Sequence, residues 1–107
     1  MSSPGVTKTL SLGTPWQRLG TVYDPNNPTT LQEGNAIASG CYLYVDTNDC
    51  CVCFSDTLPS AAVTKGHVLA AGDSAIWDGG AWITRAWFRN KTAGSVAVLV
   101  VTPIFAY

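Results

Sequence analysis

Four cysteines and one histidine are the residues of this chain whose chemistry best suits metal binding or nucleophilic catalysis. Cys41, Cys50, Cys51 and Cys53 fall within thirteen residues, and a single residue separates Cys51 from Cys53. Structural zinc sites usually separate paired cysteines by about two to four residues, and on a strand Cys50 would point away from Cys51 and Cys53. The spacing therefore favours small buried apolar side chains, a role that free cysteine readily fills. A zinc site and disulfide bonds stay open as alternatives, and the lack of a visible secretion signal disfavours the disulfides.

The sequence patterns of the common enzyme classes are missing. His67, the single histidine, opens a predicted strand, and nothing beside it in the sequence supports a Cys–His nucleophilic pair. The chain contains no G-x-S-x-G elbow, no H-E-x-x-H motif and no glycine-rich phosphate loop. Five aspartates lie at or beside predicted turns, where aspartate commonly bonds to the local backbone: Asp46, Asp49, Asp56, Asp73 and Asp78. We therefore expect no enzyme activity, no cofactor and no metal; a calcium site built from these aspartates is the remaining alternative.

Composition points to one small domain whose surface is poor in charge. The 107 residues suit a single domain spanning residues 1–107. Hydrophobic residues make up 47% of the chain and charged residues 12%, whereas a soluble surface usually carries about 25–35% charged residues. Such a chain is expected to cover part of its surface with other subunits or with a larger body; a neutral monomer rich in Ser, Thr and Asn is the alternative.

Charge and hydropathy exclude two classes of partner. The net charge is −1, with both signs scattered along the chain, so the basic stripe of a nucleic-acid-binding protein is missing. The longest apolar run, residues 96–101, is too short to cross a bilayer as a helix, and the first residues do not resemble a signal peptide. We expect a protein made in a cytoplasm that binds neither nucleic acid nor membrane.

The elements that position these residues are predicted to be β-strands throughout. Alternating apolar residues and turn signals indicate about seven or eight short strands, typical of a small antiparallel β-sandwich, jelly-roll-like, or of a barrel. The predicted strands cover residues 7–12, 16–22, 41–46, 50–55, 67–70, 74–78, 81–88 and 96–102. Turns are expected at residues 47–49, 71–73, 79–80 and 89–95, and a surface loop at residues 23–30.

Two of these turns predict hairpins. Residues 47–49 would join strands 41–46 and 50–55, and Gly79-Gly80 would join strands 74–78 and 81–88 in a two-residue turn. In the second hairpin Trp77 would face Trp82, a pair that adds about 0.5–1.5 kcal/mol beyond burial of its area. The pair would either stabilise the hairpin or form an exposed platform that docks on a partner or on a sugar ring.

Tryptophan and arginine supply the candidate interface. Arg85, Trp87 and Arg89 alternate along one predicted strand and so share one face, and these two residue types are enriched in interface hot spots. The alternative is an arginine pair at the edge of the sheet with Trp87 partly in the core. The large apolar residues of the chain are together expected to exceed what one core can hold. The interface candidates are therefore Trp16, Trp77, Trp82, Arg85, Trp87, Arg89, Phe105 and Tyr107.

Residues 41–101 resemble small β-sandwich modules in the structural proteins of tailed bacteriophages. The resemblance is carried by the runs CYLYVDTNDCCVCFSDTLPS, HVLAAGDSAIWDG and AWITRAWFRNKTAGSVAVLVV, and by three motifs within them: Phe54-Ser55-Asp56, Leu69-Ala70-Ala71-Gly72-Asp73-Ser74 and Thr92-Ala93-Gly94-Ser95. The cysteine cluster departs from the pattern, which usually carries Val, Ile or Gly there. The first forty residues match nothing in these modules.

The resemblance implies a virion component. The expected function is that of a capsid decoration (cement) protein that stabilises the phage head, sits on the major capsid protein as a homo-oligomer, expected to be a trimer, and uses residues 1–7 as an extended N-terminal arm. The alternative is a tail or fibre module that binds host glycans through exposed tryptophans. A small intracellular enzyme subunit ranks below both.

Overall fold

The computed structural model describes residues 2–19, 32–33, 36–60, 62–79, 83 and 85–106, and its elements confirm the all-β prediction. Within these residues there is no helix with the length and hydropathy needed to span a bilayer. Ten strands are described: β1 (Ser2–Pro4), β2 (Lys8–Leu12), β3 (Gln17–Arg18), β4 (Gln32–Glu33), β5 (Ala36–Thr47), β6 (Cys50–Phe54), β7 (His67–Leu69), β8 (Ser74–Asp78), β9 (Ala86–Asn90) and β10 (Ala97–Ala106).

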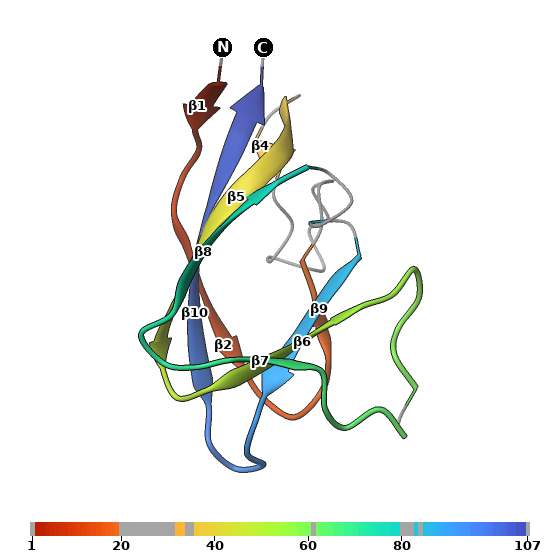
Figure 1. Cartoon of the computed structure of the whole chain (residues 1–107). Helices are drawn as coiled ribbons and strands as arrows, with labels where there is room; N and C mark the ends of the chain where they lie inside the picture. Colours follow the sequence, from red (N-terminus) through yellow and green to blue (C-terminus); the bar gives the residue numbers. More distant parts are fainter. Residues whose placement is uncertain are drawn as a thin grey trace.

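The strands form two antiparallel sheets that face each other (Figure 1). In the larger sheet β10 and β5 lie side by side at the centre. β1 and β2 pair with β10 on the side away from β5, and β4 and β8 pair with β5. The smaller sheet has the order β3-β9-β6-β7. Apart from β1 and β4, the strands run β2-β10-β5-β8 in one layer and β3-β9-β6-β7 in the other, which is the strand order of a jelly roll.

Alternation along the strands explains why the two layers pack together. In β5, Cys41, Leu43 and Val45 are buried, while Tyr42 and Tyr44 between them are exposed. Leu10 and Leu12 of β2 and Leu99 and Val101 of β10 follow the same period of two and fill the same core. Each sheet thus presents one apolar face to the other.

Aromatic rings tie the two sheets together. Trp77 of β8 lies 5.5 Å from Phe54 of β6 and 5.7 Å from Phe88 of β9, measured between ring centroids. Both distances lie within the range in which aromatic pairs attract. The contact joins the larger sheet to the smaller one.

Both predicted hairpins are wrong in their pairing. The strands on either side of residues 47–49 are β5 and β6, which lie in different sheets, and the same is true of β8 and β9 on either side of Gly79-Gly80. The chain changes layer between β5 and β6 and between β8 and β9, because each strand buries its apolar face in the common core instead of continuing a single sheet. Trp82 lies outside the described residues, so its predicted pairing with Trp77 stays a prediction.

Three predicted turns are confirmed by their backbone. Asn48, Gly72 and Gly94 have φ of 58°, 91° and 84°, in the left-handed region that asparagine and glycine adopt most easily. Each lies within a predicted turn.

The N-terminal segment lies along its own chain. Ser2–Pro4 pair with Ile104–Ala106 of β10, and the N–H of Gly5 donates to the carbonyl of Pro103 at 2.8 Å. The two ends of the chain therefore lie side by side at one end of the molecule (Figure 1). Contact of residues 1–7 with a neighbouring subunit stays a prediction.

Candidate functional site

Strand β9 is buried on both faces by its own chain. Ala86 and Phe88 point into the core, and Trp87 and Arg89 lie on the opposite, outward side of the smaller sheet. The predicted alternation is confirmed for Trp87 and Arg89, whereas Arg85 precedes β9. Trp87 is 9% exposed, its Nε1–H donates to the carbonyl of Ser55 at 3.0 Å, and the guanidinium of Arg18 lies 5.6 Å from the centre of its ring.

A second arginine–tryptophan stack lies beside the first. The guanidinium of Arg89 is 5.8 Å from the centre of the Trp16 ring, and Trp16 Nε1–H donates to the carbonyl of Val63 at 2.9 Å. Arg89 is also 9% exposed, and its Nε–H donates to the carbonyl of Asn90 at 3.2 Å. Cation–π contacts strengthen as water is excluded, so these two stacks stabilise the outward side of the smaller sheet from within the chain.

The remaining interface candidates fall into different environments. Arg85 is on the surface, where its Nε lies 2.7 Å from Asp56 Oδ1 with both side chains more than half exposed; such a pair contributes about 0–1 kcal/mol. Trp77 and Phe105 are core residues, 8% and 6% exposed. Trp82 and Tyr107 lie outside the described residues. Of the eight candidates, Arg85 and the half-buried Trp16 offer described surface to a partner.

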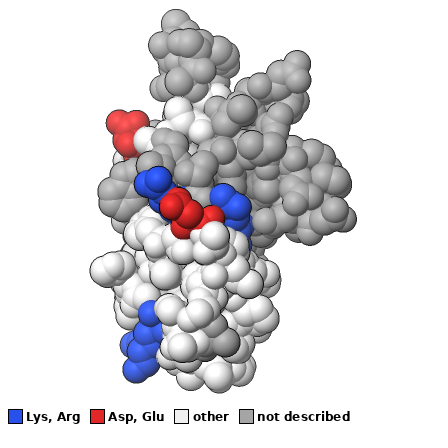
Figure 2. Space-filling view, turned by 90° about the vertical axis from the view of Figure 1, so that its right-hand side faces the viewer, with Lys and Arg blue, Asp and Glu red and all other residues white. Residues whose placement is uncertain are grey.

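Charged groups occupy little of the visible surface. Figure 2 shows the described part of one side of the molecule as largely uncharged, with lysine, arginine and acidic residues confined to a few small groups. This distribution agrees with the 12% charged residues of the sequence.

The cysteines are placed as small apolar side chains. All four are free thiols; Cys41, Cys50 and Cys51 are buried and Cys53 is half-buried. Cys41 and Cys50 belong to the core cluster, whereas Cys51 and Cys53 pair with Arg89 and Trp87 on the outward side. Among the described residues, no group of three or more His, Cys, Asp or Glu side chains is arranged to hold a metal ion.

Burial makes two of these thiols weaker acids than a free cysteine. It raises the pKa of Cys41 from 9.0 to about 12, and it is also the main cause that raises the pKa of Cys50 to about 12, with smaller contributions from Cys51, Asp49 and Asp73. A thiolate is the reactive form of cysteine. We therefore expect a thiol reagent at pH 8 to modify Cys53 rapidly in the native protein and all four cysteines only after unfolding. Cys53→Ser should remove the rapid phase, and rapid modification of Cys41 or Cys50 would contradict this placement.

The same pKa values give stability a defined pH dependence. The unfolded thiols ionise near pH 9, whereas the folded ones stay protonated up to about pH 12. Stability from these groups is therefore complete below about pH 9 and is lost as the pH rises towards 12. The double variant Cys41→Val, Cys50→Ala should show a smaller drop in unfolding temperature between pH 8 and pH 10 than the parent chain.

Turn aspartates act on the backbone. Asp49 Oδ1 accepts from the N–H of Ala71 and Asp73 Oδ2 from the N–H of Ala70, both at 2.9 Å. Lys91 Nζ lies 3.8 Å from the other oxygen of Asp49. These carboxylates hold the turns at one end of the sandwich together, which is the local role expected of aspartate in turns.

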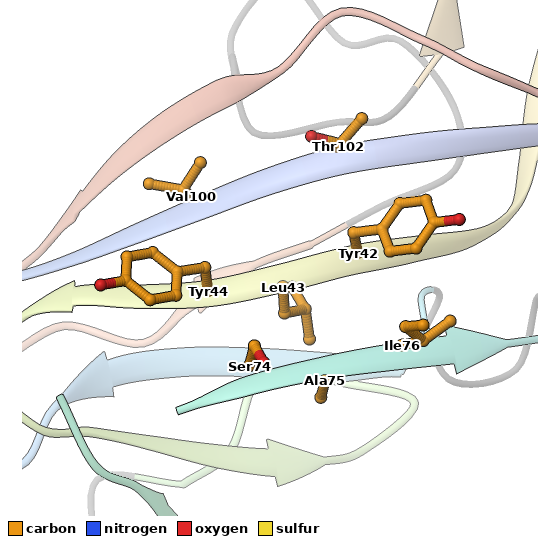
Figure 3. Close-up of a pocket in the computed structure, with 8 residues that line it drawn as sticks. All are labelled: Tyr42, Leu43, Tyr44, Ser74, Ala75, Ile76, Val100 and Thr102. Atoms are coloured by element: carbon orange, nitrogen blue, oxygen red, sulfur yellow. The ribbon is translucent and has the colours of Figure 1, made fainter. Parts of the chain in front are cut away.

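The outward side of the larger sheet carries a group of exposed aromatic and apolar side chains. The interface prediction missed this group. Tyr42 and Tyr44 of β5 are 48% and 44% exposed, and Ile76 of β8 is 66% exposed. They border a hollow of about 590 Å³ that Ser74, Val100 and Thr102 also line, with Leu43 and Ala75 beneath. In Figure 3 the tyrosine rings lie between the side chains of β10 and those of β8, and Leu43 points away from them.

We call the six outward residues, Tyr42, Tyr44, Ser74, Ile76, Val100 and Thr102, the tyrosine face. The alternation in CYLYVD carried the signal, because on a strand it puts both tyrosines on the side opposite Cys41, Leu43 and Val45. Within the described part of the chain, the side chains that line the hollow carry no charge. The face offers apolar contact and hydroxyl groups.

Comparison of the chain with protein-family models, with curated proteins and with solved structures finds no match. The surface chemistry of the described residues is therefore the guide to function.

Proposed function

We propose that the chain is a virion structural protein that decorates the phage capsid as a cement protein, in contact with the major capsid protein and with copies of itself in a trimer. The observation that carries the proposal is the distribution of exposed apolar side chains over both sheets. It supports a role in assembly without catalysis.

Exposed apolar residues lie on both sheets. The tyrosine face occupies the larger sheet. In the smaller sheet Phe54 of β6, Val68 of β7 and Leu58 between them are 38%, 49% and 63% exposed. Phe54 lies on the core side, 5.5 Å from the ring of Trp77, whereas Val68 lies opposite Cys51 on the outward side. Val6 and Val96 are 65% and 52% exposed. Exposed apolar surface marks interaction sites, and its presence on both sheets suits a subunit with more than one kind of partner.

The surface area indicates how such contacts would form. The chain has 5866 Å² of accessible surface, close to the roughly 5,700 Å² expected for a monomeric protein of 11.3 kDa. The subunit therefore folds as a compact body, and assembly would join surfaces that are already formed in the folded monomer. The jelly roll is an architecture used by viral capsid proteins and also by lectins, so the fold is compatible with the proposal without deciding it.

Immunogold electron microscopy of phage particles produced from the genome that encodes the chain tests the location. We expect label on the heads, and particles that lack the chain should release their DNA at a lower temperature than complete particles. Label on tails or fibres would favour the second candidate, an adhesive tail module, for which the tyrosine face is the supporting observation. Particles without label would contradict both.

A further inference from the structure

We propose that the tyrosine face binds a neutral oligosaccharide. This binding goes beyond the structural role proposed above and does not depend on where in the virion the chain sits. The arrangement of the six side chains is the first reason. Tyr42 pairs with Ile76 on one side and Thr102 on the other, and Tyr44 pairs with Ser74 and Val100 in the same way.

The two rows form a short platform. Outward residues two apart on a strand lie about 6.6–6.8 Å from each other, and neighbouring strands lie about 4.7–4.9 Å apart. Tyr42 and Tyr44 therefore stand next to each other at the centre of the platform, with β10 and β8 on either side (Figure 3). The hollow of about 590 Å³ above them lies within the range of about 300–1,000 Å³ that small-molecule sites occupy.

The chemistry of the face matches that of a sugar. Aromatic rings and the side chains of Ile76 and Val100 offer apolar surface to the C–H faces of a pyranose. The hydroxyls of Tyr42, Tyr44 and Ser74 can each donate and accept a hydrogen bond with a ligand. The hydroxyl of Thr102 lies 2.7 Å from Thr7 Oγ1. Apolar walls with a few hydroxyl groups describe a site for a ligand that is itself part apolar and part hydroxylated.

The charges on and around the tyrosine face favour a neutral ligand. None of the described residues that line the hollow is charged, and the next outward positions along β5 and β8 are Asp46 and Asp78, both exposed. These carboxylates lie at opposite ends of the platform, because β5 and β8 are antiparallel. An anionic ligand would be repelled from either end.

Charge and area both disfavour a second copy of the chain on this face. In a face-to-face pair related by a two-fold axis, each acidic end meets an acidic end of the partner, and juxtaposed like charges oppose association. The three strands, taken over the five residues that pair between β5 and β8, define a face of about 240 Å² from the usual strand spacings. A standard interface buries about 800 Å² on each partner, whereas an oligosaccharide of a few rings needs no more than this face offers.

Native affinity electrophoresis of the full chain tests the proposal. The gels contain one neutral polysaccharide each, a dextran, a galactomannan or a mixed-linkage β-glucan, and a further gel contains dextran sulfate. We expect at least one neutral polymer to retard the chain and dextran sulfate not to. Tyr42→Ala and Tyr44→Ala should each weaken the retardation about tenfold, the loss expected of a central aromatic contact. Tyr44→Phe, which keeps the ring, should weaken it only a few-fold, and Val96→Ala, an exposed residue outside the face, should leave it unchanged.

Thermal unfolding of each variant separates loss of binding from loss of fold. The proposal is overturned if none of the neutral polymers retards the chain, or if both tyrosine variants bind as the parent does while folded. It is also overturned if sedimentation shows that Tyr44→Ala turns an oligomer into monomers, because a second copy would then occupy the face.

Discussion

Replacing Gly40 with alanine should lower the free energy of unfolding by about 3 kcal/mol, the upper range for a side chain forced into a packed site. Gly40 lies in β5 opposite Asp78 of β8. A β-carbon at this position would overlap the carbonyl oxygen of Trp77 and would lie 3.4 Å from the Cα of Asp78. Both neighbours are backbone atoms of the paired strand, so relief requires β8 to move away. That movement would also disturb Trp77, whose ring joins the two sheets.

Gly13→Ala is the matched control for this change. Its β-carbon would meet only the Cδ of Pro15 at 3.7 Å, an ordinary contact, so its effect should stay below about 1 kcal/mol. Urea denaturation followed by tryptophan fluorescence measures both variants. Equal stability of the two would show that β8 does not lie against Gly40 as described.

Trp87→Ala should lower the free energy of unfolding by about 3–5 kcal/mol, as is typical when a buried tryptophan is truncated. The indole is 9% exposed, is held by its hydrogen bond to Ser55 and is stacked with Arg18. The change would leave a cavity beneath Arg18 and remove the donor that satisfies the Ser55 carbonyl. In a domain of this size the unfolding temperature should fall by more than about 10 °C.

The variants of Trp87 also decide between its two predicted roles. Trp87→Phe keeps an aromatic ring and should retain a substantial part of the stability, while Val96→Ala, at an exposed position, should change it by less than about 0.5 kcal/mol. If Trp87→Ala unfolded like the parent chain and yet failed to assemble, Trp87 would be an interface anchor. The burial of its ring predicts the opposite result.

Local sequence was sufficient for the all-β class, for the buried side of β5 and for three of the turns. The alternation in CYLYVD determines which side of β5 is buried, and Asn48, Gly72 and Gly94 take the backbone angles for which these residue types are suited. Local sequence did not determine which strands pair. A tight turn reverses the chain whether the next strand joins the same sheet or the opposite one, and that choice depends on the core that all strands share. Gly79-Gly80 therefore predicted a hairpin where the chain crosses between sheets.

The end of β10 shows a second limit. The predicted strand ended at residue 102 because proline lacks the N–H that a central strand donates. The strand continues to Ala106, with Pro103 opposite Cys41 and accepting a hydrogen bond from Gly5 on its other side. The partner that makes this possible is the N-terminal segment, more than ninety residues away in sequence.

The candidate surfaces were predicted unevenly. Residue type singled out tryptophan and arginine, but these side chains stack on each other within the chain, as Arg18 does on Trp87 and Arg89 on Trp16. The tyrosine face was visible in the alternation of β5, but its other members come from β8 and β10. Which strands lie beside β5 is set by the topology, and so the face appears only once the sheet is assembled.

Sedimentation velocity of the purified chain at micromolar concentrations tests most directly whether it is an assembly subunit. A chain with 12% charged residues and with Leu58, Val68 and Val96 exposed outside the tyrosine face predicts a closed oligomer, a trimer of the 11.3 kDa chain, whose mass does not grow further with concentration. A single species of 11.3 kDa at every concentration, together with no label on the virion, would contradict the account and identify the chain as a neutral monomer.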